Sequence, residues 1–326
     1  MIAVLIAGSV AMILSLFGTR WLIAIFDSLG KGQPILGCED HGPVHHMKKQ
    51  GTATMGGIAI IFSAFIGWLV AHLRGGIALS DQAMIMWAGV GILSLMGFLD
   101  DFLKVRKSHN RGILWKKKGY ITFAMVIGLM WWLLAGTGIS ETLSFTRSDF
   151  PGWNLSPVLW VVWTAIMVWA TTNAVNVTDG LDGLAAGSAL FGFLAFTVIA
   201  YWGFRNPDVY NLVNPLDLAV FSAAMAGACG GFLWWNAAPA RIFMGDSGSL
   251  CIGAILSVLA IKLIDTPIGT IPEQFQLVSK PILAMTILAY PLLDTLRVFS
   301  IRAASGKSPL SADRNHIHHK LLDKQN

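Results

Sequence analysis

The chain has 326 residues, of which 55% are hydrophobic and 13% charged, with a mean hydropathy of +0.63 and a formal net charge of +5. Soluble domains carry roughly 25% charged residues, so this composition excludes a soluble globular protein and indicates an integral membrane protein. The basic excess favours anionic lipids and phosphate-bearing ligands. Nucleic acid is not expected as a partner, because no soluble basic domain is present to bind it.

Nine apolar stretches are long enough to form membrane spans, since a spanning helix needs about 20 residues. We therefore predict an all-α fold, a polytopic transmembrane helix bundle of about nine spans, in which residues 1–326 form a single membrane domain. Pro291 is expected to kink the ninth span. The predicted spans are 2–26, 56–73, 83–99, 120–136, 156–175, 184–202, 217–237, 249–264 and 280–299.

The polar segments between these spans differ sharply in charge. Segments 27–55, 100–119 and 238–248, with the tail from Arg297 onward, carry 17 Lys and Arg residues, whereas the opposite loops carry only three. The positive-inside rule then places the N-terminus outside and the C-terminus in the cytoplasm. Segment 173–183 falls on the cytoplasmic side by counting spans. We expect these segments and the tail 300–326 to form one active site at that surface.

The first polar segment is basic and leads into a glycine-rich helix start. Lys49 and Thr54 precede Gly56 and Gly57. Such a stretch can bind a phosphate, or it can be an ordinary positively charged cytoplasmic loop.

Adjacent carboxylates mark the start of segment 100–119. Asp100 and Asp101 repel each other unless a cation or a shared proton relieves the repulsion. Lys104 can lie beside them on one helical face. A solvated helix end with a lysine cluster is the alternative.

Segment 173–183 places a polar residue at every third position. Asn173, Asn176, Asp179 and Asp182 would lie along one side of a helix end or tight turn. Carboxamides donate and accept hydrogen bonds, which suits recognition of a base, a ribose or a phosphate. Asn and Asp also favour turns, but four of them in register at a membrane boundary make that reading weaker.

Asp246 lies between Gly245 and Gly248, just before an apolar span. The helix N-terminus that follows is a ready anion site. Magnesium takes one or two carboxylates and completes its shell with phosphate oxygens and water, so Asp246 suits a Mg²⁺ ligand. The alternative is a simple helix N-cap.

Three histidines, His316, His318 and His319, cluster in the tail. Zinc is disfavoured as their ligand, because no Cys is near and hard oxygen ligands dominate elsewhere. Hydrogen bonds to a phosphate, or general acid–base work, are the favoured roles.

Taken together, four strings resemble the cytoplasmic motifs of the polyprenyl-phosphate N-acetylhexosamine-1-phosphate transferase superfamily. They are GPVHHMKKQGTATMGG, GFLDDFLKVRK, NAVNVTDGLDGLAAG and NAAPARIFMGDSGS, and the resemblance covers about residues 1–260. These strings are similar to the muramoyl branch, with Ala53 in place of the usual proline. The string PLLDTLRVFSIRAASGKSPLSADRNHIHHKLL is instead similar to the sister branch, which uses UDP-N-acetylglucosamine or related sugars.

The resemblance implies a Mg²⁺-dependent enzyme of the bacterial inner membrane. Its expected reaction moves phospho-MurNAc-pentapeptide from UDP-MurNAc-pentapeptide to undecaprenyl phosphate, which gives lipid I and UMP in peptidoglycan synthesis. A UDP-GlcNAc-type donor is the alternative that the tail motif raises. The partners implied are the UDP-sugar, the polyprenyl phosphate and membrane lipids, and the resemblance is compatible with a homodimer.

The resemblance also implies roles for individual residues. Asp246 would ligate Mg²⁺, and Asp100 and Asp101 would position or deprotonate the lipid phosphate. The phosphates would contact Lys49, Thr54 and Lys104. The uridine–diphosphate pocket would be shaped by Asn173, Asn176, Asp179, Asp182, Asn236 and Phe243. His316, His318 and His319 would face the phosphates or the sugar, with His318 as a catalytic residue.

Two alternatives stay open at this point. The transfer can be direct, with the lipid phosphate attacking the β-phosphorus, or it can pass through an aspartyl-phosphate. An ion-coupled transporter is the rival of a different class, but its carboxylates should lie inside the spans. Release of UMP from a UDP-sugar distinguishes the enzyme from the transporter.

Overall fold

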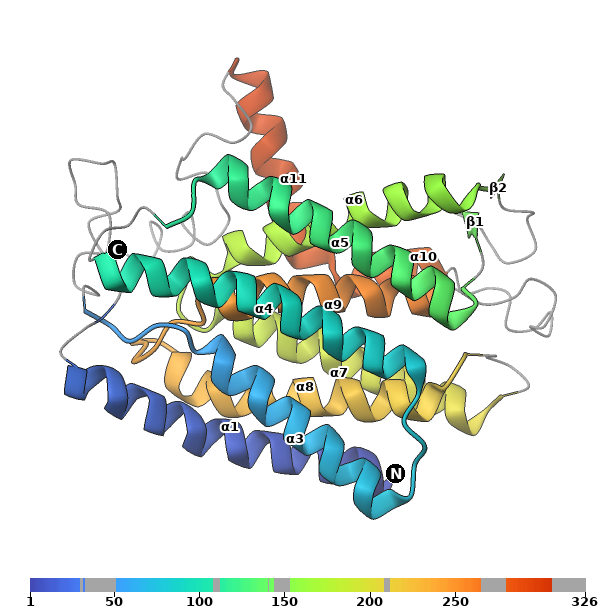
Figure 1. The fold of residues 1–326 in the computed structure, drawn as a ribbon, viewed down its shortest axis with the longest axis horizontal. Coiled ribbons are helices and arrows are strands. Elements are labelled where there is room, and N and C mark those ends of the chain that lie inside the picture. Colours follow the sequence, from blue (N-terminus) through green and yellow to red (C-terminus); the bar gives the residue numbers. More distant parts are fainter. Residues whose placement is uncertain are drawn as a thin grey trace.

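The computed structural model describes residues 1–29, 32, 51–107, 112–139, 141–143, 153–207, 212–264 and 280–306. Its long helices lie side by side along the long axis of the molecule (Figure 1). Within the described ranges, eight helices are long and apolar enough to cross a membrane, so the predicted all-α, multi-pass membrane fold is confirmed. The helices are α1 (Ile2–Leu29), α3 (Gly57–Gly75), α4 (Asp81–Lys107), α5 (Trp115–Thr137), α6 (Pro157–Thr178), α7 (Leu184–Arg205), α8 (Pro215–Asn236), α9 (Asp246–Ile264), α10 (Lys280–Ile287) and α11 (Ala289–Ala304). Two short strands between α5 and α6, β1 (Thr142–Leu143) and β2 (Trp153–Asn154), pair antiparallel.

Local sequence signals explain where several helices begin and end. Ser156 caps α6, because its hydroxyl accepts a hydrogen bond from the Leu159 amide at 3.4 Å, and Pro157 occupies the first turn. Helices α3 and α5 end at Gly76 and Gly138, whose φ angles of 59° and 61° lie in the left-handed region that favours glycine.

Helix α9 is the centre of the bundle. It packs against α3, α4, α6, α7 and α10, and every residue from Ser247 to Leu263 is buried. A helix enclosed on all sides must be apolar all round, and α9 is so from Leu250 to Ile261, except for Ser257. Because Asp246 begins this helix, the packing holds that carboxylate in the middle of one end of the bundle.

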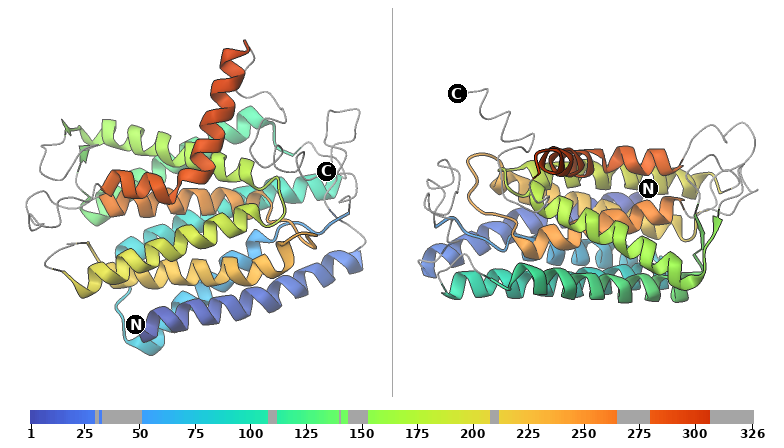
Figure 2. Two further views of the ribbon diagram at one scale, coloured as in Figure 1. Left: turned by 180° about the vertical axis from the view of Figure 1, so that it is seen from behind. Right: turned by 90° about the horizontal axis from the view of Figure 1, so that it is seen from above.

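The predicted ninth span is not one continuous helix. It is divided at Leu288 into α10 and α11, and α11 projects away from the bundle (Figures 1 and 2). Pro291 lacks an amide hydrogen, and in a continuous helix its ring would crowd the carbonyl of Ile287, four residues earlier. The kink predicted at Pro291 is therefore confirmed, and it is sharp enough to break the span into two short helices.

Helices α4, α6 and α8 end, and α3, α5, α7 and α9 begin, at one end of the bundle, on the left of Figure 1. The described polar motifs therefore lie together, as the counting of spans predicts. Two of the helices extend further than their apolar stretches: α4 continues to Lys107 and α6 to Thr178. Asp100, Asp101 and Asn176 thus lie on rigid helix ends and not in loops.

A second buried polar cluster lies at the opposite end, where α3 ends and α4 and α8 begin. The Asp217 carboxylate accepts hydrogen bonds from the Trp68 indole at 2.9 Å and from the Ser80 hydroxyl at 2.5 Å. His72 Nε2 lies 3.0 Å from the same carboxylate, while its Nδ1 lies 2.9 Å from the Trp68 carbonyl oxygen. The cluster ties α3, the start of α4 and α8 together.

Replacing Asp217 by Ala is expected to destabilise the protein by about 3–5 kcal/mol, because the buried Trp68 and His72 and the half-buried Ser80 lose their common acceptor. Thermal melting of the purified protein in nanodiscs measures the effect. The control is Asp81→Ala, which removes an exposed acid from the first turn of α4 and should cost less than about 1 kcal/mol. Equal melting temperatures for the two variants would contradict this account.

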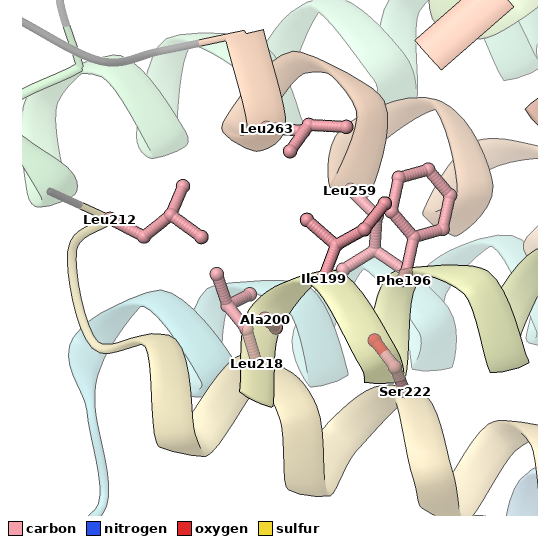
Figure 3. Close-up of a pocket in the computed structure, with 8 residues that line it drawn as sticks. All are labelled: Phe196, Ile199, Ala200, Leu212, Leu218, Ser222, Leu259 and Leu263. Atoms are coloured by element: carbon pink, nitrogen blue, oxygen red, sulfur yellow. The ribbon is translucent and has the colours of Figure 1, made fainter. Parts of the chain in front are cut away.

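A pocket lies between α7, α8 and α9 at the same end as Asp217 (Figure 3). Its lining is apolar except for the Ser222 hydroxyl, and it holds no titratable side chain. The pocket lies near the C-terminal end of α9, away from Asp246. The lining residues are Phe196, Ile199, Ala200, Leu212, Leu218, Ser222, Leu259 and Leu263.

Candidate active site

Three carboxylates from two helices meet at the end of the bundle where α4 ends and α9 begins. Asp100 and Asp101 lie near the end of α4, and Asp246 begins α9. Each offers a carboxylate oxygen, and these oxygens all lie within 4.8 Å of one another. Asp100 and Asp101 are buried, and the Asp246 side chain is 12% exposed. Such a concentration of negative charge needs cations beside it.

Two lysines supply part of that positive charge. Lys104 Nζ lies 2.8 Å from Asp100 Oδ2 and 2.7 Å from Asp246 Oδ2. Lys118 Nζ, from α5, lies 3.2 Å from Asp100 Oδ2 and also pairs with Asp246 Oδ2. The three carboxyl groups thus share two ammonium groups, and their grouped oxygens are the donors that a further cation would take.

Backbone amides fix the orientation of the two α4 carboxylates. The amide of Ile113 donates to Asp100 Oδ1 at 2.6 Å, and the amide of Ser247 donates to Asp101 Oδ2 at 3.1 Å. The second bond joins the end of α4 directly to the first turn of α9. The cluster is therefore held by both helices before any ligand arrives.

The donor set fits a hard divalent cation. Mg²⁺ takes carboxylate oxygens at about 2.0–2.1 Å and leaves positions for phosphate oxygens and water. Asp100, Asp101 and Asp246 offer only oxygen atoms to the cluster, and the described residues bring no Cys or His into it. This set does not favour Zn²⁺, which proteins bind mainly through thiolate and imidazole ligands.

Helix α6 and the turn that follows it contribute the next contacts. The Asn176 amide donates to Asp246 Oδ1 and to Ser249 Oγ, both at 2.7 Å. Asp179 accepts the Gly245 amide at 3.2 Å, and Asp182 accepts the Ala240 amide at 3.1 Å. These three side chains therefore hold the segment that carries Asp246.

Asn173 lies outside this arrangement. Its side chain is exposed and donates to the Trp169 carbonyl of its own helix. A step of three residues on a 3.6-residue helix turns the side chain back by about 60°, so a run of such steps does not stay on one face. The sequence expectation that all four polar residues share one side is therefore wrong for Asn173.

The surroundings of Asp179 favour the neutral form of its carboxyl group. Burial of the carboxyl, followed by the Asp246 and Asp101 charges, raises the pKa of Asp179 well above its usual range. A neutral carboxyl can donate a hydrogen bond as well as accept one.

Asn236 and Phe243 position the chain near the cluster. The buried Asn236 amide donates to the Ile242 carbonyl at 2.9 Å, and its oxygen accepts the Gly183 amide at 3.1 Å. Phe243 donates its amide to the Ala53 carbonyl at 2.9 Å. The segment with Thr54 is thereby paired with the segment that leads to Asp246, and Thr54 is buried beside Gly245.

Residues 83–264 match the family model described as glycosyl transferase family 4. The chain belongs to glycosyl transferase family 4. Three curated relatives are named phospho-N-acetylmuramoyl-pentapeptide-transferase and come from Frankia casuarinae, Streptomyces griseus and Mycobacterium tuberculosis. They are 41%, 40% and 42% identical to the chain. Each alignment covers 79% of the chain and 75%, 76% and 76% of the relative, respectively.

In this family 4 transferase, four of the predicted site residues lie outside the described residues: Lys49, His316, His318 and His319. The roles predicted for them stay predictions.

Lys118, by contrast, is a cluster residue that the sequence does not single out. It is the last of three consecutive lysines, and successive helical residues point about 100° apart. Lys116 and Lys117 are exposed, and Lys118 contacts the carboxylates.

The two asparagines of α6 provide a matched pair for testing the site. Asn176→Ala is expected to lower the transferase rate about 10-fold, because a side chain that orients Asp246 is lost. Asn173→Ala, on the same helix and one turn earlier, should leave the rate near wild type. Steady-state UMP release measures both variants, and equal rates would contradict the assignment of Asn176 to the cluster.

Proposed function

We propose that this chain transfers phospho-MurNAc-pentapeptide from UDP-MurNAc-pentapeptide to undecaprenyl phosphate, which yields lipid I and UMP. The observation that carries the proposal is the cluster of Asp100, Asp101 and Asp246 with two lysines at one end of a membrane bundle. Relatives about 40% identical over 79% of the chain, all named for that activity, support the choice of donor.

The position of the cluster suits both substrates. A nucleotide sugar comes from the aqueous phase and the polyprenyl tail stays in the bilayer, so the reaction needs a polar site at a membrane boundary. The excess of Lys and Arg in the segments at this end supports a cytoplasmic location, with the N-terminus outside, in the bacterial inner membrane.

In the proposed mechanism the side chains mainly position charges, as is general for phosphoryl transfer. Asp246 would hold Mg²⁺, with Asp100 and Asp101 close enough to share it. When bound, the ion supplies neutralisation of charge on the donor diphosphate. Lys104 and Lys118 lie where they can pair with phosphate oxygens, and Asp100 would help to orient the lipid phosphate.

The chemical step that we favour is direct. An oxygen of the lipid phosphate bonds to the β-phosphorus of the donor, the bond between that phosphorus and the bridging oxygen breaks, and UMP leaves with the electron pair. The product is a polyprenyl diphosphate that carries the sugar.

Turnover assays with the purified protein in nanodiscs test the proposal. UDP-MurNAc-pentapeptide and UDP-GlcNAc are supplied separately with undecaprenyl phosphate and Mg²⁺. We expect UMP release and lipid-linked product with the muramoyl donor, and loss of both when EDTA replaces Mg²⁺. Product from UDP-GlcNAc alone would transfer the assignment to the sister branch, and folded protein without turnover on either donor would contradict the enzyme.

A further inference from the structure

Gly97 lies on α4, one turn before Asp100 and Asp101, where α4 meets the first turn of α9. A Cβ atom at this position would overlap the carbonyl group of Asp246 and would lie 2.6 Å from the Ser247 amide nitrogen. All of these are backbone atoms, so no side chain can rotate to make room. Any larger residue must push the two helices apart.

Gly97 contacts the first turn of α9, which belongs to the acidic cluster. This turn presents the Asp246 carboxylate, and its Ser247 amide bonds to Asp101 Oδ2 at 3.1 Å. The contact at Gly97 and the bond to Asp101 are thus two parts of one junction between α4 and α9. A backbone shift at the Gly97 contact therefore changes the separation of the Asp246 and Asp101 carboxylates.

The same turn is confined by a second helix. A Cβ atom on Gly57, at the start of α3, would overlap the Gly248 backbone and would lie 2.7 Å from the Ser247 carbonyl carbon. Residues 246–248 are therefore in close backbone contact with α4 through Gly97 and with α3 through Gly57. The start of α9 has little room to move without altering the cluster.

From this packing we infer that Gly97 is a positioning residue, which sets the separation of Asp246 from Asp101 and thereby the affinity of the cluster for a divalent cation. The inference rests on the proposed function only in taking the cluster as the metal site. A Cβ atom at Gly97 requires a backbone shift of roughly an ångström to reach ordinary contact distance. A site must hold its ligands within about 0.5 Å, and Mg²⁺ demands near-ideal geometry.

The test compares three glycines of α4, each replaced by Ala. Gly97→Ala changes the junction, while Gly89→Ala faces only flexible side-chain atoms of Leu129, at 2.7 and 2.8 Å. At Gly91 a Cβ atom meets nothing within 4 Å. Gly89→Ala thus controls for disturbed packing, and Gly91→Ala controls for the substitution itself.

Binding of Mn²⁺ to purified protein, followed by loss of the free-ion EPR signal, is the readout and requires no turnover. We expect the dissociation constant for Mn²⁺ to rise at least 10-fold in Gly97→Ala and to stay unchanged in the two controls. The rate of Gly97→Ala should also rise with Mg²⁺ concentrations that already saturate wild type. A wild-type Mn²⁺ affinity in Gly97→Ala, or an equal loss in Gly89→Ala, would overturn the inference.

If Gly97→Ala yields no monodisperse protein, Gly57→Ala takes its place, and a wild-type affinity there overturns the inference equally. The outcome is separable from that of the proposed function. Wild-type protein that binds Mn²⁺ but releases no UMP contradicts the function alone. Active wild-type protein with an unaltered Gly97→Ala affinity contradicts the positioning role alone.

Discussion

Replacing Asp246 by Asn will reduce kcat/KM for UMP release by at least about 10³-fold, because several kcal/mol of charge stabilisation at the diphosphate depend on this carboxylate. Asp246 is the residue on which the cluster converges: Lys104, Lys118 and Asn176 all contact it. The amide of Asn has nearly the same shape but carries no charge. The substitution therefore removes the negative charge of the proposed cation ligand while it keeps the packing of α9.

The matched control is Asp81→Asn, an exposed acid in the first turn of α4. It should retain wild-type turnover, which shows that the loss at Asp246 does not follow from a changed net charge. Both variants should elute as wild type in size exclusion. If Asp246→Asn kept more than a tenth of the wild-type rate at saturating Mg²⁺, Asp246 would not be the central ligand.

Replacing Lys118 by Met will lower kcat/KM roughly 10²-fold, the usual effect of removing one preorganised charge from a phosphoryl-transfer site. Lys118 pairs with both Asp100 and Asp246, so its loss leaves Lys104 as the single ammonium group beside all three acids of the cluster. Met keeps the length and apolar stem of the side chain. The expected loss is therefore electrostatic, and it should be larger at low than at saturating Mg²⁺.

Lys117→Met is the control, because Lys117 is the exposed neighbour on the same helical turn. It removes the same charge from the same surface and should change kcat/KM by less than about twofold. Comparable losses in the two lysine variants would mean that the basic surface as a whole, and not the Lys118 contact, supports turnover.

The fold is largely readable from the sequence because the bilayer restricts the choices. Apolar stretches of about 20 residues must form helices, and counting them places alternate loops at opposite ends of the bundle. This counting alone places Asp100, Asp101, Asp179, Asp182 and Asp246 at the same end of the bundle. Pro291 likewise carries its own signal, since proline cannot continue the helix that precedes it.

Other features depend on how helices pack, and sequence spacing does not report packing. Lys118 is distinguished from Lys117 only by the rotation of α5 about its axis, and Asn173 from Asn176 only by that of α6. Asp217 begins an apolar span and gives no hint that Trp68, His72 and Ser80 will surround it. Gly97 resembles any other glycine until its backbone is seen against Asp246.

The most direct test of the account is the location of a divalent cation. Crystals grown with Mn²⁺ and the UDP-sugar, measured at the manganese absorption edge, give an anomalous difference peak at the metal. We predict one peak about 2.2 Å from an oxygen of Asp246, next to Asp100 and Asp101 and in contact with the donor diphosphate. A peak away from all three aspartates, with the diphosphate bound elsewhere, would contradict the account.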